Sequence, residues 1–246
     1  MNNRTQKLIF TGLLITIGIV LSQFLSISIP PQTTIIRIGI GYLPLMLISL
    51  LYGPMVGLVS GLIQDILGLT IGGGLAYFHF GFVLNAMIIG FMPGFLLRYL
   101  PFKDKVYKII NIVIASILSI AGLVLLMDIS IITDVTLRLE VGGTIELGKT
   151  MAYVLVSSSL FAVLLMLVFV IIRKPQNNNH QIIFFVTSLL FLTSVILTPI
   201  WVSQLFGHPY LIQLPLRLIK FPLEAIIYSI LLVRLYVLIK RLEATR

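Results

Sequence analysis

The sequence predicts an all-α integral membrane protein, folded as a bundle of helices that cross the bilayer. Hydrophobic residues fill 59% of its 246 positions and charged residues only 10%, whereas soluble domains carry roughly 25% charged residues. Mean hydropathy is +1.12, and successive apolar runs are long enough to cross about 30 Å of hydrocarbon. Cysteine is absent, which excludes a disulfide framework and a thiolate metal site.

Eight apolar runs predict eight membrane spans. The first follows the charged start MNNRTQK, and we interpret it as a retained helix because no small-x-small cleavage site follows it. Segment 30–37 then forms an outer loop, and Gly-Pro and Gly-rich segments mark later reversals of the chain. The predicted spans cover residues 8–29, 39–52, 55–69, 82–99, 106–127, 151–172, 182–205 and 212–239.

The distribution of Lys and Arg predicts the orientation of the bundle. An even number of spans places both termini on one side, and twelve of the 17 Lys and Arg residues fall on that side. The positive-inside rule therefore predicts cytoplasmic termini. These basic residues lie at the ends of apolar runs and do not form one patch, so the net charge of +9 does not indicate nucleic-acid binding.

Small residues at helical spacing predict close contacts between spans. Association in lipid brings no hydrophobic gain, so helices pack where glycine and alanine let their backbones approach. An acid on such a face is expected to point into the protein, because exposure to lipid is costly. The residues that share these faces are Gly53, Gly57, Gly61 and Asp65, followed by Ala86, Gly90 and Gly94.

Segment 37–98 carries a long pattern that reads R-I-x-x-G-Y-L-P, then L-Y-G-P-x-x-G-x-x-x-G-x-x-x-D-x-L-G, then A-Y-F and G-F. This pattern resembles the substrate-binding S component of energy-coupling factor (ECF) vitamin transporters, with the folate branch nearest. The residues that carry the resemblance are Arg37, Gly41, Leu43, Pro44, Tyr52, Gly53, Pro54, Gly57, Gly61, Asp65, Gly68, Ala76, Tyr77, Phe78, Gly81 and Phe82.

The resemblance implies a function and a set of partners. S components bind a water-soluble vitamin from outside the bacterial cell membrane, and folate is the best match here. They deliver the vitamin together with a transmembrane coupling subunit and two cytosolic ATPases. The chain itself is therefore expected to be no enzyme and to need no cofactor.

The resemblance also implies a division of the chain. S components of the folate type usually have six spans, so the two additional apolar runs are expected to form an inserted hairpin. The predicted parts are core spans 1–4 in residues 1–99, the inserted hairpin in 100–181 with an outer loop at 128–150, and core spans 5–6 in 182–246.

Polar residues in the last span predict a ligand site. Arg217, Lys220 and Glu224 share an arc of about 60° on one helix face, and ionisable residues inside a membrane are functional by default. We expect Arg217 and Lys220 to bind a substrate carboxylate. Alternatively, Lys220 and Glu224 neutralise each other, and Arg217 snorkels to the outer interface.

Further candidates come from the resemblance near the outer surface. The stretches T-P-I-W and L-P-L-R-L-I-K resemble the folate-branch patterns N-T-x-W and L-P-x-R-L-x-K. Thr198 and Pro199 replace the usual Asn-Thr, and Gln23 stands where the branch commonly has Arg, so another vitamin such as riboflavin or pantothenate stays open. Trp201 could equally be an interfacial anchor. The substrate-binding candidates are Gln23, Arg37, Tyr77, Phe78, His79, Trp201, Arg217 and Lys220.

Two small residues in the first span are candidates for a partner interface. In S components a pair of small residues four positions apart, normally two alanines, contacts the coupling subunit. Gly12 and Thr16 occupy the similar position. The alternative is that this pair only packs inside the bundle.

Other functional motifs are weak. Gly143, Gly148, Lys149 and Thr150 fit the phosphate-binding loop G-x-x-x-x-G-K-T, but they fall in a predicted outer loop with no strand before them, so we interpret the match as accidental. The three histidines, His79, His180 and His208, are scattered without metal-ligand spacing, and each is expected to be solvated or interfacial, with His180 in a polar linker. The alternative from another class, a membrane-embedded enzyme acting on a lipid or isoprenoid, lacks paired acids at the spacing that such chemistry needs.

Overall fold

The structure is a computed structural model of the chain, and it describes residues 3–29, 36–72, 78–100, 103–127, 149–174, 179–207 and 210–244. Helices make up nearly all of these residues. They are α1 (Asn3–Phe24), α2 (Leu43–Tyr52), α3 (Pro54–Ile71), α4 (Phe80–Tyr99), α5 (Asp104–Met127), α7 (Lys149–Ile172), α8 (Asn179–Leu190), the π-helix η2 (Phe191–Leu197), α9 (Thr198–Phe206) and α10 (Tyr210–Ala244).

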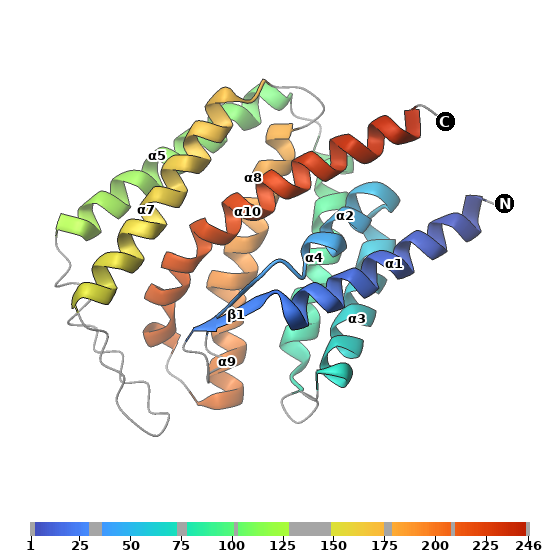
Figure 1. Cartoon of the computed structure of the whole chain (residues 1–246), viewed down its shortest axis with the longest axis horizontal. Helices are drawn as coiled ribbons and strands as arrows, with labels where there is room; N and C mark the ends of the chain where they lie inside the picture. The colour runs from blue at the N-terminus through green and yellow to red at the C-terminus, as the bar shows by residue number, and fades with distance from the viewer. Residues whose placement is uncertain are drawn as a thin grey trace.

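The helices form a bundle in which α10 runs across the middle (Figure 1). The pair α5 and α7 lies at one edge, and α1 and α3 lie at the other. Helix α1 begins and α10 ends at the same end of the bundle. Within the described residues, five helices are long and apolar enough to cross a membrane. These are Arg4–Phe24, Pro54–Ile71, Phe80–Tyr99, Asn179–Phe206 and Lys220–Lys240. The chain is therefore a helical, multi-pass membrane protein.

The sequence predicted a single helix over residues 8–29, but the first apolar run does not form one. Helix α1 ends at Phe24, and β1 (Ser26–Ile29) pairs antiparallel with β2 (Ile36–Gly39), so that Ser28 lies opposite Arg37. Alternation of Ser with Ile, and the β-branched Ile side chains, favour a strand over a further helical turn. The prediction that segment 30–37 is entirely loop was therefore wrong for residues 36 and 37.

Helix α2 is short and central. It begins at Leu43, four residues later than predicted, and its ten residues are about 15 Å long, so it crosses only about half of the hydrocarbon layer. The side chains of Leu45, Met46 and Ile48 are fully buried against the surrounding helices. The Tyr228 hydroxyl joins this helix to β2, because it accepts a hydrogen bond from the Tyr42 N–H at 3.2 Å and donates one to the Gly39 carbonyl at 3.0 Å.

The predicted small-residue faces of α3 and α4 are in direct contact. A Cβ atom on Gly57 would overlap the Gly90 carbonyl, and one on Gly90 would overlap the Gly57 carbonyl. Gly61 approaches the carbonyl of Ala86 in the same way. Backbone-to-backbone packing of this kind is available only to residues without larger side chains, so the glycine spacing fixes the distance between these two helices.

The predicted span 182–205 is one continuous helical rod with a π-helical segment in its middle. In η2 the N–H of Thr198 bonds to the carbonyl of Thr193, five residues back, and the Thr198 hydroxyl donates to the same carbonyl at 2.5 Å. Pro199 follows directly. Because a proline ring collides with the carbonyl four residues earlier in a regular α-helix, the wider π turn accommodates it.

Polar contacts fasten α5 to the start of α8. One carboxylate oxygen of Asp104 accepts hydrogen bonds from the N–H groups of His180 at 2.9 Å and Gln181 at 3.0 Å. Asn111 donates to the His180 carbonyl at 2.8 Å. His180 is fully buried, so the expectation that it lies solvated or interfacial in a polar linker was wrong. The reason is that Asp104, 76 residues earlier, accepts hydrogen bonds from the free N–H groups at the start of α8 and so holds this end of the helix against α5.

We expect Asp104→Ala to lower the free energy of unfolding by about 1 to 2 kcal/mol, because the first turn of α8 loses its capping acceptor. Asp104→Asn should cost less, since an amide oxygen can still accept. Thermal or denaturant unfolding followed by circular dichroism measures both. Equal stability of Asp104→Ala and the wild type would show that water replaces the cap without loss.

Candidate ligand-binding site

Aromatic rings gather where α4 begins. The Nδ1 atom of His79 accepts a hydrogen bond from the Gly81 N–H at 3.1 Å, so this side chain caps the helix. The centroid of the His79 ring lies 5.7 Å from that of the Trp201 ring at an interplanar angle of 37°, and 6.0 Å from that of the Phe82 ring at 69°. A Cβ atom on Gly81 would overlap the Trp201 indole. The glycine therefore lets the indole lie directly on the α4 backbone.

Asn85 fixes the orientation of that indole. The Trp201 Nε1–H donates to the Asn85 Oδ1 at 3.2 Å, and the Asn85 amide donates in turn to the Thr198 hydroxyl at 3.1 Å. Asn85 is only 4% exposed, so water competes little for these hydrogen bonds. Asn85 was not among the site residues predicted from the sequence. An amide in the otherwise apolar run F-V-L-N-A-M was the available signal, because buried polar groups are normally hydrogen-bonded.

Arg217 is buried near the start of α10. Its side chain is 4% exposed, and its guanidinium donates to the Ser194 carbonyl of η2 at 3.3 Å and to the Gln213 side-chain oxygen at 3.5 Å. It does not snorkel to the surface, so that alternative was wrong. Ser194 and Thr198 are four residues apart in the η2–α9 rod. The rod thus carries both the Arg217 contact and the Trp201–Asn85 network.

Lys220 and Glu224 form a buried ion pair. Their side chains lie 3.1 Å apart and are about 10% exposed or less. The backbone of Gly39 also hydrogen-bonds to the Glu224 carboxylate. The structure thus agrees with the alternative in which Lys220 and Glu224 neutralise each other. A ligand carboxylate that binds Lys220 would therefore have to compete with Glu224.

The other predicted site residues lie around the same end of the bundle. Gln23 donates to the Gly68 carbonyl at 2.9 Å near the end of α3, and its amide packs against Gly72. Phe78 is 49% exposed just before α4. Arg37 is placed by its backbone in β2. Tyr77 lies outside the described residues, as do the phosphate-loop residues 143–148.

The predicted interface pair lies on the outside of α1. Gly12 and Thr16 are both exposed, and the Thr16 hydroxyl bonds back to the Gly12 carbonyl at 3.0 Å. A Cβ atom on Gly12 meets nothing within 4 Å, whereas one on Gly18 would overlap the Gln64 amide. Of these glycines, Gly18 packs inside the bundle. The described contacts therefore do not support the alternative that Gly12 and Thr16 only pack internally.

These features define a class: a multi-pass membrane protein in which a half-buried ring group (His79, Phe82 and Trp201) and a buried arginine contact one helical rod. The chain belongs to the family of S components of ECF-type riboflavin transporters, whose family model matches residues 2–152. This confirms the predicted resemblance to ECF S components. Trp201, Arg217 and Lys220 lie beyond the matched residues.

One curated relative is similar over part of its length. The folate transporter FolT of Clostridium novyi (strain NT) is 38% identical over 85 residues, which cover 35% of this chain and 46% of the relative. The chain thus spans about half the length of the curated relative it matches. No solved structure matches the chain.

Proposed function

We propose that this chain is the substrate-capture S subunit of an ECF-type importer and that it binds a vitamin carrying both a flat ring and a carboxylate, with folate as the best candidate. It would take the vitamin from outside and pass it across the membrane together with a transmembrane coupling subunit and two cytosolic ATPases. Membership of the S-component family supports the transport role, and the folate transporter relative supports the choice of vitamin.

The proposal rests above all on one observation. The η2–α9 rod contacts Asn85, which orients Trp201, through Thr198, and it contacts Arg217 through the Ser194 carbonyl. Trp201 and His79 offer aromatic faces for stacking a heterocycle. The Arg217 guanidinium is buried, so a ligand carboxylate would form charge-assisted hydrogen bonds to it in a site shielded from water. Gln23, Arg37, Tyr77 and Phe78 remain proposed contacts around this centre.

The alternatives differ in which half of the site they use. Riboflavin, the vitamin in the name of the matching family model, has a flat ring but no carboxylate, so it would use Trp201 and not Arg217. Pantothenate has a carboxylate but no ring, so it would use Arg217 and not Trp201. Folate has both parts.

We also propose the arrangement in the membrane. Eight spans would place both termini in the cytoplasm, in the plasma membrane of a bacterium. The pair α5 and α7 would form a hairpin inserted between core spans 1–4 and core spans 5–6. The packing of α5 on α7 supports this pairing, and the basic residues near the chain ends support the orientation.

We expect Arg217→Gln to weaken binding of folate by about 1.5 to 3 kcal/mol, the usual range for a hydrogen bond to a charged group, and to leave a pteridine without the glutamyl tail unaffected. Trp201→Ala should weaken both. Isothermal titration with folate, this pteridine, riboflavin and pantothenate measures the effects. Arg234→Gln is the matched control, because Arg234 is exposed on the same helix.

Three results would contradict the proposal in different ways. Tight riboflavin binding without folate binding would replace the vitamin and keep the S-component role. Equal loss of both pteridine ligands in Arg217→Gln would make Arg217 a structural residue. Binding of none of the four ligands by well-folded protein would remove the ring-and-carboxylate assignment.

A further inference from the structure

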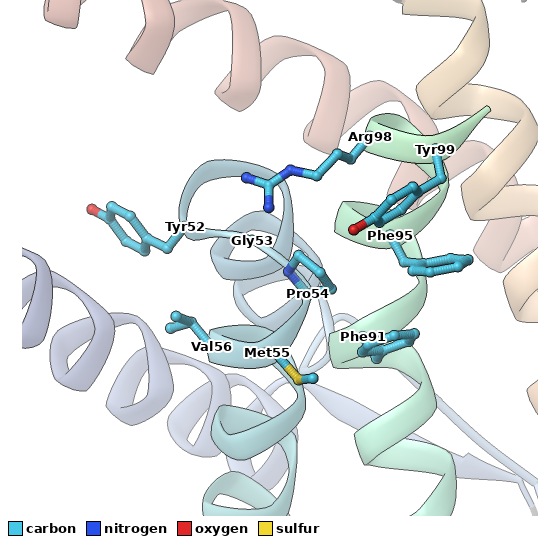
Figure 2. Close-up of a pocket in the computed structure, with 9 residues that line it drawn as sticks. All are labelled: Tyr52, Gly53, Pro54, Met55, Val56, Phe91, Phe95, Arg98 and Tyr99. Atoms are coloured by element: carbon cyan, nitrogen blue, oxygen red, sulfur yellow. The ribbon is translucent and has the colours of Figure 1, made fainter. Parts of the chain in front are cut away.

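A second candidate site lies at the opposite end of α4. This helix begins beside Trp201 and ends at Tyr99. Between its last turns and the α2–α3 turn lies a cavity of about 270 Å³ (Figure 2). Neither the ring group nor the buried cations Arg217 and Lys220 line this cavity. The cavity is therefore separate from the proposed vitamin site.

One wall of the cavity is an aromatic ladder. Phe91, Phe95 and Tyr99 follow each other at every fourth position of α4, with ring centroids 5.1 Å apart for the first pair and 4.8 Å apart for the second. Phe95 is 36% exposed and Tyr99 62% exposed, and Met55 across the cavity is 69% exposed. On a membrane-spanning helix such exposed apolar groups face lipid, so the cavity opens sideways toward the bilayer.

The other feature of the cavity is a cation. Arg98 is exposed, and its guanidinium lies over the Gly53–Pro54 turn, 3.9 Å from where a Cβ on Gly53 would be (Figure 2). Gly53 has φ +101°, a conformation that other residues rarely adopt, so the turn keeps a bare surface beneath the guanidinium. Among the residues that the structure describes, Arg98 makes no hydrogen bond or ion pair.

We propose that this cavity binds the headgroup of an anionic phospholipid. The phosphate would bond to the Arg98 guanidinium, which can donate two parallel hydrogen bonds to it. The glycerol and the first part of the acyl chains would lie along Phe95, Tyr99 and Met55. A cation next to a lipid-facing apolar wall selects an amphiphile with an anionic head, and basic pockets between helices at the cytoplasmic side are known to suit such lipids.

Native mass spectrometry of the full chain in detergent, titrated with phosphatidylglycerol and phosphatidylcholine, tests this assignment. The wild type should bind one phosphatidylglycerol about tenfold more tightly than phosphatidylcholine, because the choline cation of phosphatidylcholine would lie close to the Arg98 guanidinium and be repelled by it. Arg98→Gln should bring the ratio to about one, and Arg98→Lys should keep most of it because the charge remains. Lys105→Gln, which removes an exposed charge outside the cavity, should leave the ratio unchanged.

Two further measurements keep the outcome decisive. Melting temperatures in lipid-free detergent should be the same for the wild type and Arg98→Gln, and phosphatidylglycerol should raise that of the wild type more than that of Arg98→Gln. Equal binding of the two lipids by the wild type, or an unchanged preference in Arg98→Gln, would overturn the proposal. Displacement of the lipid by equimolar glycerol phosphate would also overturn it, because the site would then bind a soluble anion.

Discussion

Gly57→Ala should lower the free energy of unfolding by about 3 kcal/mol, the upper part of the range for overpacking. The added methyl group would have to occupy the position of the Gly90 carbonyl, which is backbone and cannot turn away. The helices α3 and α4 must therefore separate, and the neighbouring contact between Gly61 and Ala86 would open with them.

Gly68→Ala provides the matched control, because it makes the same change on the same helix. A Cβ atom on Gly68 meets nothing within 4 Å, and alanine favours a helix over glycine by up to about 1 kcal/mol. This variant should be as stable as the wild type or more stable. Denaturant unfolding in one detergent measures both variants, and equal stability of the two would show that α3 and α4 are not in backbone contact.

Replacing Gly12 and Thr16 together by Leu should weaken assembly with the proposed coupling subunit and leave folding and the proposed vitamin binding largely intact. The two positions are exposed on α1, and a Cβ atom on Gly12 meets nothing within 4 Å, so added bulk has room in the free subunit. It would block close approach only of another helix. Co-purification with the coupling subunit and the ATPases, and vitamin titration on the same preparations, measure the two properties.

The control for this pair is Gly12→Ala with Thr16→Ala. The resemblance to S components implies alanine at these positions, so this variant should still assemble. If the Leu pair assembles normally, the interface lies elsewhere on the subunit. If the Leu pair loses vitamin binding while assembly survives, these residues belong to the core of the bundle.

The helices and the contact between α3 and α4 could be predicted because their signals are local. Apolar runs of sufficient length, and glycines at every fourth position, are visible in a single sequence. The strands β1 and β2 were missed because the alternation S-I-S-I is contained within a longer apolar run. In such a run, helix and strand patterns are difficult to separate.

The candidate site could be predicted only in part. Trp201 and Arg217 were selected from their own sequence context, but Asn85 was not, because its partners lie 113 and 116 residues away. The same holds for His180, whose burial depends on Asp104 in a distant helix. Long-range hydrogen bonds leave no local pattern, so the sequence showed which residue types were available and not which of them meet.

The π-helix η2 sets the direction in which the indole of Trp201 points. A π turn holds about one residue more than an α turn, and one residue corresponds to a rotation of about 100° around the helix axis. If residues 191–197 were regular α-helix, Trp201 would be turned away from Gly81 by that angle, whatever the residues around it. The direction of the indole therefore depends on the number of residues in the π-helical segment. A single insertion or deletion within residues 191–197 would redirect it, although every side chain of the ring group would still be present.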